Sequence, residues 1–316
     1  MAVVGIDLGA TKLAGALFDA QGRILYRCRT QRNTRTDRAV GRLIRQQVAD
    51  LLKQAGTREV EAIGICVPGI AHAKTGRVWA PNIPGWEDYP LRDEIISALG
   101  QSGLPVVVDN DRAAYILGET WRGAARRCRD AIFLAVGTGI GAGILVQGEV
   151  LRGAHGIAGA IGWMALDHPF VADYVPCGCF EHHASGAGLA RQAQELFTDN
   201  NHRRRFRGKR RFTAQDIFSA AARGDRVAQK CVGQAIEYWG MAVANLVSLF
   251  NPEKIIFGGG VFGPATRFLP RIRREAGKWA QPIAMRRVRI VASQLGGDAG
   301  LYGAGFLALR ARRNSR

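Results

Sequence analysis

The feature that most constrains the fold is a strand–turn–strand unit that occurs twice in the 316 residues of this chain. In residues 3–26 an apolar run is broken at Gly9, resumes, and is followed by a polar turn and an alternating run. Residues 131–151 repeat this order around a glycine-rich turn. Both segments predict strands joined by tight turns. The copies lie roughly 125 residues apart, which is too long for a solenoid repeat and is typical of a duplicated domain.

Helical and strand patterns alternate along the rest of the chain, which indicates an α/β protein built as two similar halves. Apolar residues recur at helical spacing in residues 37–54, 111–122, 184–197, 214–223 and 225–249. Short β-rich runs occupy residues 61–67, 105–109, 253–259 and 288–293. We expect a smaller N-terminal α/β domain at residues 1–118, completed by a C-terminal helix at about 299–316, and a larger C-terminal α/β domain at residues 119–298.

The formal net charge of +18, from 44 basic and 26 acidic residues, raises the question of a polyanionic partner. The excess is concentrated in Arg203–Arg211 and in a C-terminal group, Arg310, Arg312, Arg313 and Arg316. Blocks of like charge repel one another, so we interpret these segments as a solvated loop and a tail. No helix-turn-helix pattern precedes residue 3, so nucleic acid is not an expected partner. Polyphosphate is an alternative anion.

The six cysteines indicate reduced thiols, because a chain of this size needs no disulfide framework. No apolar run approaches the roughly 20 residues that cross a bilayer. The N-terminal segment lacks the basic and apolar regions of a signal peptide. We therefore expect a cytoplasmic protein.

The turn Gly137–Ala142 matches G-x-G-x-x-G/A, the fingerprint of dinucleotide-binding folds. That fingerprint requires a helix to begin directly after it. Here residues 143–146 continue as an apolar strand and a second turn follows. The pattern therefore favours a hairpin over a dinucleotide-binding fold.

Glycine and threonine at a hairpin tip let backbone N–H groups approach phosphate oxygens. Three turns have this composition: Gly9, Thr11 and Lys12; Gly137, Thr138 and Gly139; and Gly258, Gly259 and Gly260. Lys12 adds a positive charge, and the third turn lets a flat group such as adenine approach the backbone. Each turn alone is equally compatible with an ordinary tight turn. Together they predict an ATP site.

Asp7 lies between Ile6 and Leu8 in an apolar strand, where an ionised carboxylate is costly unless it is paired or near a metal. Either local backbone N–H groups satisfy it, or it orients hydrated Mg²⁺ on the phosphates of the nucleotide. We expect the second arrangement, with Asp7 as the metal-orienting residue.

Asp109, Asn110 and Asp111 lie where an apolar strand ends and a helix begins. Aspartate is favoured at helix N-caps, so a capping role for Asp111 is one interpretation. A carboxylate at the C-terminal end of a strand is also well placed to take a proton from a substrate hydroxyl. We predict that Asp111 is a general base.

Six segments resemble the ROK family (repressor, open reading frame, kinase), in order and with the expected spacing from residue 3 to about residue 308. They are VVGIDLGATKLAGALFD, VPGIAHAKTGRVWAPNIPGW, DNDRAAYILGE, AVGTGIGAGILVQGEVLRGAHGIAGAIG, CFEHHASG and NPEKIIFGGGVF. The resemblance implies two ribonuclease H-like domains, as in actin and hexokinase, with a cleft that holds ATP and a sugar. It also implies a homodimer.

The activity that the resemblance implies is that of an ATP-dependent hexokinase or glucokinase-like kinase, which transfers the γ-phosphate to a hexose hydroxyl, O6. Three alternatives stay open. They are a fructokinase, a kinase of a sugar modified near its anomeric carbon, and a non-catalytic sugar-sensing regulator.

The resemblance further implies roles for single residues. Asp111 matches the catalytic base, and Asn110 matches a ligand of a sugar hydroxyl. Gly69 and Asn82 match the other wall of the sugar pocket, and Glu181 matches a glutamate that binds sugar hydroxyls near the anomeric carbon. The three glycine turns match the nucleotide-binding turns of the family.

The sequence departs from the family at G-E-I-G-H, whose glutamate binds the sugar and whose histidine binds both sugar and zinc. Here Ala160 and Trp163 replace these two ligands. A charge-assisted hydrogen bond to a sugar contributes about 1.5–3 kcal/mol, so their loss weakens binding of free glucose. Trp163 either stacks on a sugar face or an apolar substituent, or fills the volume of a missing zinc site. We expect relaxed specificity, or a sugar modified near its anomeric end.

The zinc site that the family implies is also incomplete. Of its three cysteines, only Cys177 and Cys179 are present. Tetrahedral zinc needs four ligands, and His168, His182 or His183 would have to supply the rest. We expect no structural zinc.

Overall fold

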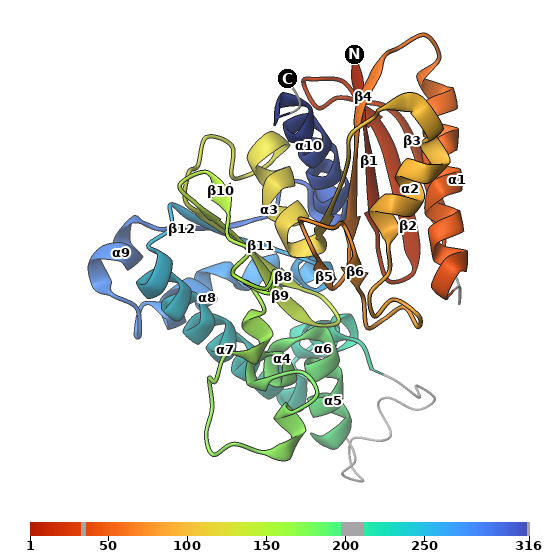
Figure 1. Cartoon of the computed structure of the whole chain (residues 1–316). Coiled ribbons are helices and arrows are strands. Elements are labelled where there is room, and N and C mark those ends of the chain that lie inside the picture. Colours follow the sequence, from red (N-terminus) through yellow and green to blue (C-terminus); the bar gives the residue numbers. More distant parts are fainter. Residues whose placement is uncertain (33–35, 197–211, 315–316) are drawn as a thin grey trace. The chain divides into compact units, whose positions relative to one another are not determined.

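The computed structural model describes residues 1–32, 36–196 and 212–314, so the basic segment Arg203–Arg211 lies outside the described residues (Figure 1). The chain forms two compact units. Unit 1 comprises residues 1–127, 150–158 and 298–316, and unit 2 comprises residues 128–149 and 159–297. The segment 150–158 thus belongs to unit 1. The domain boundaries expected from the sequence, 1–118 and 119–298, stay a prediction.

Unit 1 is built on a five-stranded sheet with the order β3-β2-β1-β4-β7. Its strands are β1 (Ala2–Leu8), β2 (Lys12–Phe18), β3 (Ile24–Gln31), β4 (Val60–Val67) and β7 (Val106–Asn110). Consecutive hairpins make β1, β2 and β3 antiparallel, whereas β4 and β7 run parallel to β1. A two-stranded ribbon, β5 (Ile70–Ala71) and β6 (Val78–Trp79), follows β4.

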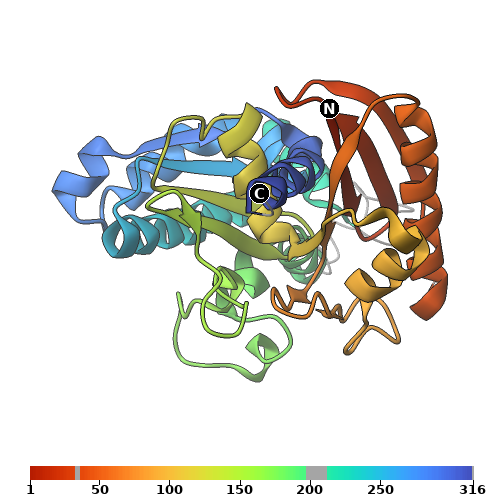
Figure 2. The same cartoon turned by 45° about the horizontal axis from the view of Figure 1, so that its top comes forward.

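Helices cover both faces of this sheet (Figures 1 and 2). On one face lie α1 (Asp37–Ala55) and α2 (Leu91–Leu99), and on the other lie α3 (Asp111–Arg122) and α10 (Ala299–Asn314). In α1, the apolar residues share one face of the helix and are buried against the strands. They include Val40, Ile44, Val48 and Leu51.

The other face is close-packed because glycine lies where backbones cross. A Cβ atom on Gly64 of β4 would lie 2.0 Å from the carbonyl oxygen of Ala304. One on Gly303 would lie 1.9 Å from the carbonyl oxygen of Ala114. Neither position admits a side chain, so the C-terminal helix packs directly against β4 and α3.

Unit 2 has the same topology as unit 1. Its sheet has the order β10-β9-β8-β11-β12. The strands are β8 (Ala131–Val136), β9 (Ile140–Val146), β10 (Glu149–Val150), β11 (Lys254–Gly258) and β12 (Arg289–Ala292). β9 is antiparallel to β8, whereas β11 and β12 run parallel to it. Because the two sheets share their strand order, and β9, β8, β11 and β12 share the directions of β2, β1, β4 and β7, the internal repeat predicted from the sequence is confirmed.

The helices of unit 2 pack around α7 (Arg226–Phe250). They are α4 (Cys179–Ala184), α5 (Gly186–Leu196), α6 (Ala214–Ala222), α8 (Leu269–Ala276) and α9 (Pro282–Arg287). The side chain of Asp225 caps α7 by accepting a hydrogen bond from the N–H of Ala228. Farther along α7, the buried indole of Trp239 donates to the carbonyl of Ala184. One core therefore joins α7 to β8, β9 and β11.

The helices predicted from periodicity are confirmed. The one expected at 184–197 is α5, which begins at Gly186, and the separate helix α4 before it was not predicted. Short 3₁₀ turns complete the structure: η1 (Gly100–Ser102), η2 (Ile161–Trp163), η3 (Ala172–Tyr174), η4 (Gly260–Phe262), η5 (Pro264–Phe268) and η6 (Gly296–Asp298). The sequence did not predict α2, α8 and α9, which are too short to give a clear helical period.

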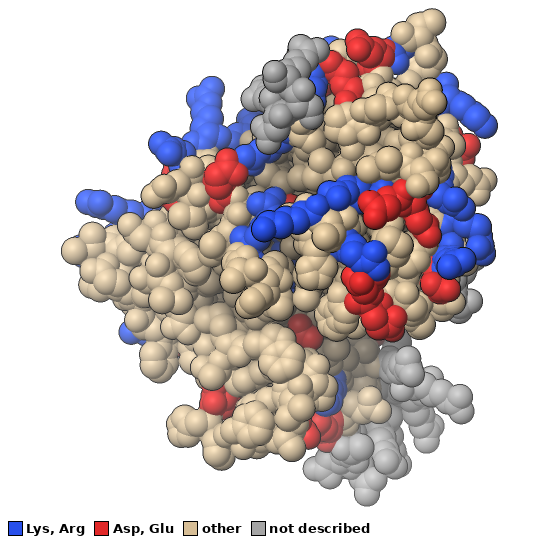
Figure 3. Space-filling view, in the orientation of Figure 1, with Lys and Arg blue, Asp and Glu red and all other residues tan. Residues whose placement is uncertain are grey.

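Two of the C-terminal arginines do not lie in the expected tail. Arg310 and Arg312 belong to α10, and Nε of Arg312 lies 2.9 Å from a carboxylate oxygen of Glu61. The prediction of a solvated tail is therefore wrong for these two residues. On the face shown in Figure 3, Lys and Arg side chains are interspersed with Asp and Glu. Within the described residues, no helix has the length and apolar character that crossing a membrane would need.

Candidate functional site

Unit 1 brings polar side chains to the C-terminal edge of its parallel strands. Asp7 on β1 is paired with Cys66 on β4, and Cys66 is paired with Asp109 on β7. Asp111 follows as the first residue of α3. In α/β folds this edge of the sheet is where ligands bind. The predicted residues Asp7 and Asp111 therefore belong to one local cluster.

The surroundings of Asp7 disfavour its negative charge. Burial and the charge of Asp111 raise the pKa of Asp7 to about 6, although the nearby Lys12 acts in the opposite direction. Its hydrogen bond comes from the thiol of Cys66, so the interpretation in which local backbone N–H groups satisfy Asp7 is wrong. At the start of α10, a Cβ atom on Gly300 would lie 2.8 Å from Oδ2 of Asp7. Two repelling carboxylates with one nearby lysine fit a cation at this edge.

Asn110, and not Asp111, caps α3. The side-chain oxygen of Asn110 accepts a hydrogen bond from the N–H of Ala113 at 2.9 Å, as an N-cap residue does. The interpretation of Asp111 as the helix cap is therefore wrong. The amide nitrogen of Asn110 keeps its capacity to donate to a ligand.

Asp111 has a carboxylate suited to proton transfer. Its Oδ1 accepts a hydrogen bond from the N–H of Arg112 at 2.9 Å. Apart from such local backbone groups, no described residue donates to this carboxylate. Burial raises the pKa of Asp111, whereas the charge of Arg112 and the backbone hydrogen bonds lower it. A raised pKa brings a carboxylate closer to the range in which a general base is efficient.

Two arginines that the sequence analysis missed form hydrogen bonds at the C-terminal edge of the sheet of unit 1. Arg112 directs Nη2 to the carbonyl oxygen of Gly69 at 3.4 Å. Arg152 donates from Nε and Nη2 to Oδ2 of Asp109 at 3.1 and 2.5 Å. The second pair ties the segment 150–158 to the strand that carries Asn110. No pattern in the sequence signals a pair that lies this far apart along the chain.

The residues predicted for one wall of a sugar pocket lie near β6. Gly69 has a φ of 96°, and a Cβ atom there would lie 2.1 Å from the carbonyl oxygen of Trp79. Asn82 is exposed, and its carbonyl oxygen lies 3.5 Å from Nη2 of Arg32. Their contact with a ligand stays a prediction.

In each of the first two glycine turns, one backbone N–H group donates a hydrogen bond to a carbonyl of the same turn. The N–H of Gly9 donates to the carbonyl of Lys12 at 2.9 Å, and that of Gly137 donates to the carbonyl of Gly139 at 2.9 Å. These two N–H groups close their turns and do not point at a ligand. The donors left for a phosphate are the other N–H groups at the tips, which include that of Thr138.

The glycines of the third turn differ from one another. A Cβ atom on Gly258 would lie 2.2 Å from the ring of Phe133, so close packing alone accounts for this glycine. Gly259 has a φ of 87° and faces the carbonyl of Val136. A Cβ atom on Gly260 would meet nothing within 4 Å. Gly260 is therefore the member of this turn that a ligand can approach.

Glu181, in the first turn of α4, is packed against the second glycine turn. Its Oε2 accepts a hydrogen bond from the N–H of Ile140 at 2.6 Å. A Cβ atom on Gly139 would lie 2.6 Å from the same oxygen, and one on Gly162 would lie 3.0 Å from it. Burial raises the pKa of Glu181. Unit 2 thus places a half-buried carboxylate directly beside a predicted nucleotide turn.

Trp163 follows Gly162 and is 58% exposed. No described residue stacks on its indole or bonds to it. The interpretation in which Trp163 fills the volume of a missing zinc site is therefore wrong. An exposed indole offers a flat apolar surface on which a ligand can stack.

The structure holds no arrangement of three or more His, Cys, Asp or Glu side chains around a common point among the residues it describes. Cys177 and Cys179 are both free thiols. Sγ of Cys177 lies 3.7 Å from the carbonyl oxygen of Gly178, and Cys179 is buried. Whether zinc binds stays a prediction.

Comparison with known proteins supplies the family. The profile of the ROK family matches residues 3–311. The glucokinase of Halalkalibacterium halodurans is 34% identical over 319 residues, covering 96% of this chain and 94% of that protein. The ROK hexokinase of Thermus thermophilus has a TM-score of 0.81 at 32% identity and covers 99% of this chain and 100% of its own.

A ROK family glucokinase from Streptomyces griseus, solved with glucose and AMPPNP, has a TM-score of 0.79 at 32% identity, with 98% of this chain and 100% of that chain covered. The predicted fold class, an α/β protein of two ribonuclease H-like halves, is confirmed by these likenesses. Since the profile and the relatives span nearly the whole chain, this protein belongs to the ROK family.

Proposed function

We propose that this chain is an ATP-dependent, glucokinase-like sugar kinase that transfers the γ-phosphate to a hexose hydroxyl, O6, with Asp111 as general base. The observation that carries the proposal is the free carboxylate at the start of α3. Asn110 satisfies the helix cap, so Asp111 is left with a carboxylate that only local backbone groups contact. Two relatives that each cover 96% of this chain are glucokinases.

In this mechanism Asp111 accepts the proton of the attacking sugar hydroxyl as its oxygen bonds to the γ-phosphorus, while the bond from that phosphorus to the β–γ bridging oxygen breaks and ADP leaves. The remaining work is positioning and neutralisation of charge at the γ-phosphate. Mg²⁺, when bound, neutralises charge on the phosphate oxygens. Asp7 would orient its hydration shell, and Lys12 and the free N–H groups at the tips of the glycine turns would hold phosphate oxygens.

The sugar-binding residues that we assign to unit 1 are Asn110, Gly69 and Asn82. Those that we assign to unit 2 are Glu181 and Trp163. The indole of Trp163 stands where a polar ligand is expected, so stacking area replaces hydrogen bonds there. The sugar is therefore a hexose accepted with relaxed specificity, or one modified near its anomeric carbon.

The other components follow from the same proposal. ATP and Mg²⁺ are the cofactors, and structural zinc is absent. We place the enzyme in the cytoplasm, where ATP is available, as a homodimer that binds no nucleic acid.

A panel of sugars tests this proposal. With ATP and Mg²⁺, we expect ADP release with glucose, mannose, fructose, amino sugars or glycosides, and selectivity of less than about tenfold between the best two, because a weakened polar contact discriminates poorly. Polyphosphate in place of ATP should support little turnover. Absence of ADP release with every sugar, together with retained sugar binding, would contradict the proposal and favour a sugar-sensing regulator.

Arg112 gives a pH-dependent prediction. Its charge lowers the pKa of Asp111, so Arg112→Met should raise that pKa further. Asp111 must be deprotonated to act as a base, so the acidic limb of the kcat/KM profile should move to higher pH. The matched control is Arg223→Met, an exposed arginine in unit 2, which should leave the limb in place. A limb that stays or moves to lower pH in Arg112→Met would contradict this assignment.

A further inference from the structure

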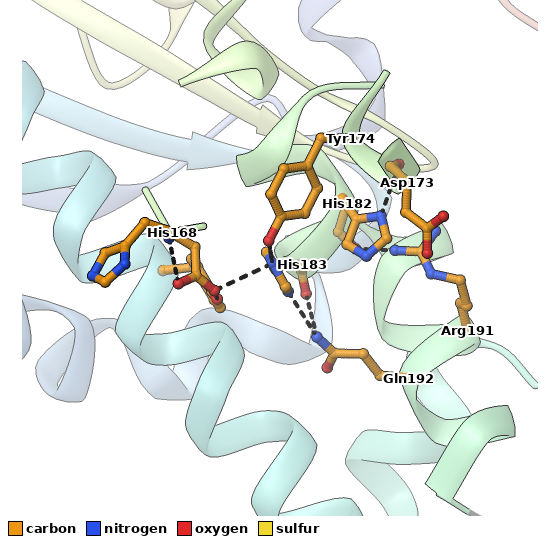
Figure 4. Close-up of polar contacts among 9 residues, drawn as sticks. His168, Asp173, Tyr174, His182, His183, Arg191 and Gln192 are labelled. Atoms are coloured by element: carbon orange, nitrogen blue, oxygen red, sulfur yellow. Dashed lines mark hydrogen bonds and ion pairs between the residues drawn. The ribbon is translucent and has the colours of Figure 1, made fainter. Parts of the chain in front are cut away.

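His183 on α4 lies at the centre of a polar cluster in unit 2 (Figure 4). Its Nε2 lies 2.8 Å from the hydroxyl of Tyr174, and its Nδ1 lies 3.5 Å from Nε2 of Gln192. The ring of Tyr238, on α7, is stacked on the imidazole at 4.4 Å between centroids and 3° between planes. Residues of η3, α5 and α7 therefore contact this histidine of α4.

Both nitrogens of the imidazole have a polar neighbour. Nε2 shares a hydrogen bond with the hydroxyl of Tyr174, which also bonds to the side chain of Cys179. The side-chain amide of Gln192 lies 3.5 Å from Nδ1 and 3.3 Å from the carbonyl oxygen of His183. Burial lowers the pKa of His183, which favours a neutral ring.

A second contact holds the same segment of chain. The hydroxyl of Tyr238 donates to Oδ2 of Asp167 at 2.5 Å, and the same oxygen lies 3.5 Å from Nε2 of His183. Asp167 and Tyr174 both belong to the segment 164–178, whereas His183 and Tyr238 belong to helices. The segment is thus attached near both of its ends.

Three other candidate zinc donors, in His182, Cys177 and Cys179, also have partners within the protein, and no three such side chains gather among the described residues. Nδ1 of His182 lies 3.2 Å from the carbonyl oxygen of Asp173. Cys179 accepts from Tyr174, and the thiol of Cys177 points to a backbone carbonyl. These residues therefore do not fit the zinc site that the family resemblance implies.

The attached segment controls the place of Glu181. The N–H of Gly178 donates to the carbonyl of Tyr174 at 2.7 Å, which closes the turn that leads into α4. Gly178 has a φ of 86°, and a Cβ atom there would lie 2.5 Å from Cα of Trp163. Tyr174 therefore fixes the start of α4 against the backbone of Trp163. Glu181 follows three residues after this contact.

We propose that Asp167, Tyr174, His183 and Tyr238 form a metal-free clasp that replaces a structural zinc and positions α4, and with it Glu181, for sugar binding. The sugar-binding part of this statement rests on the proposed function. The four residues act through Glu181 and touch no substrate, so they are positioning residues.

His183→Phe and Tyr238→Phe test the clasp in the full-length protein. His183→Phe keeps a ring against Tyr238 and removes the hydrogen bonds, and Tyr238→Phe removes only the hydroxyl that holds Asp167. Each should raise the sugar KM about tenfold, as the loss of one or two hydrogen bonds predicts. The KM for ATP should be unchanged and kcat should stay within about twofold. His168→Gln, an exposed histidine of the same segment, is the matched control and should behave as wild type.

Hydrogen exchange supplies a readout that needs no turnover. In both variants, the amides of residues 164–178 should exchange at least tenfold faster than in wild type, while those of β8 should not change. The wild-type protein should contain well under one zinc per chain, and chelator treatment should leave its exchange pattern unaltered. If the wild-type protein phosphorylates no sugar, the proposed function fails, but the exchange result still decides the clasp.

Two results would overturn the clasp. One is a stoichiometric zinc that is lost on replacing Cys177 and Cys179 with serine. The other is wild-type exchange of residues 164–178 in both His183→Phe and Tyr238→Phe. Should His183→Phe not fold, the milder Tyr238→Phe carries the test alone.

Discussion

Asp111→Asn is expected to lower kcat by about 10²–10⁴-fold, because a general base is removed while its shape is kept. The amide oxygen of asparagine can still accept the hydrogen bond that Oδ1 takes from the N–H of Arg112. The cap of α3 belongs to Asn110 and is not touched. The variant should therefore fold, bind ATP and fail at proton transfer.

The measurement is steady-state ADP release, with ATP affinity determined separately by calorimetry. Asp88→Asn is the matched control, because Asp88 is an exposed carboxylate of unit 1 that pairs with Arg77. It should leave kcat within about twofold of wild type. Wild-type turnover in Asp111→Asn would remove Asp111 from the mechanism.

Much of this fold could be predicted because its signals are local. Periodicity located α1, α3, α6 and α7, and the repeated hairpin pattern predicted two sheets of one topology. The same local patterns predicted that Asp111 lies between a strand and a helix. They did not predict which residue caps that helix, because asparagine and aspartate are both favoured at the N-cap. The hydrogen bond from the N–H of Ala113 to Asn110 decides between them.

The parts that could not be predicted depend on contacts between distant residues. Arg152 pairs with Asp109 across 43 positions, and Tyr238 bonds to Asp167 across 71. A single sequence carries no record of such pairs. For the same reason the sequence did not reveal the partners of the histidines near Cys177, of which His183 contacts Tyr174 and Gln192. The incomplete zinc motif thus predicted that metal ligands are missing from this region, but it did not predict the hydrogen bonds that stabilise it.

The glycines of the three turns have different surroundings, which amino-acid composition alone does not predict. Gly258 and Gly260 look alike in sequence, but a side chain on the first would collide with Phe133, and one on the second would enter open space. The N–H of Gly9 is consumed by its own turn. A glycine-rich pattern therefore predicts where a backbone can approach a ligand, and the packing around each residue decides which members do so.

Glu181→Gln is the second variant with a large expected effect, a rise in sugar KM of about 10–150-fold. That range corresponds to about 1.5–3 kcal/mol for a hydrogen bond to a charged group. The amide oxygen of glutamine can keep the bond from the N–H of Ile140, so the turn at Gly139 should stay intact. The substitution removes only the negative charge and the acceptor capacity of the second carboxylate oxygen of Glu181.

The KM for ATP in Glu181→Gln, measured in the same assay, should stay within about twofold, which separates a sugar contact from damage to the nucleotide turn. Glu237→Gln, an exposed glutamate on α7, is the control and should match wild type. Because Ala160 and Trp163 offer no charged acceptor on this side, Glu181 should carry most of the polar recognition that unit 2 provides. If both KM values rise together, Glu181 acts by shaping the turn at Gly139. If neither rises, Trp163 and the residues of unit 1 recognise the sugar without it.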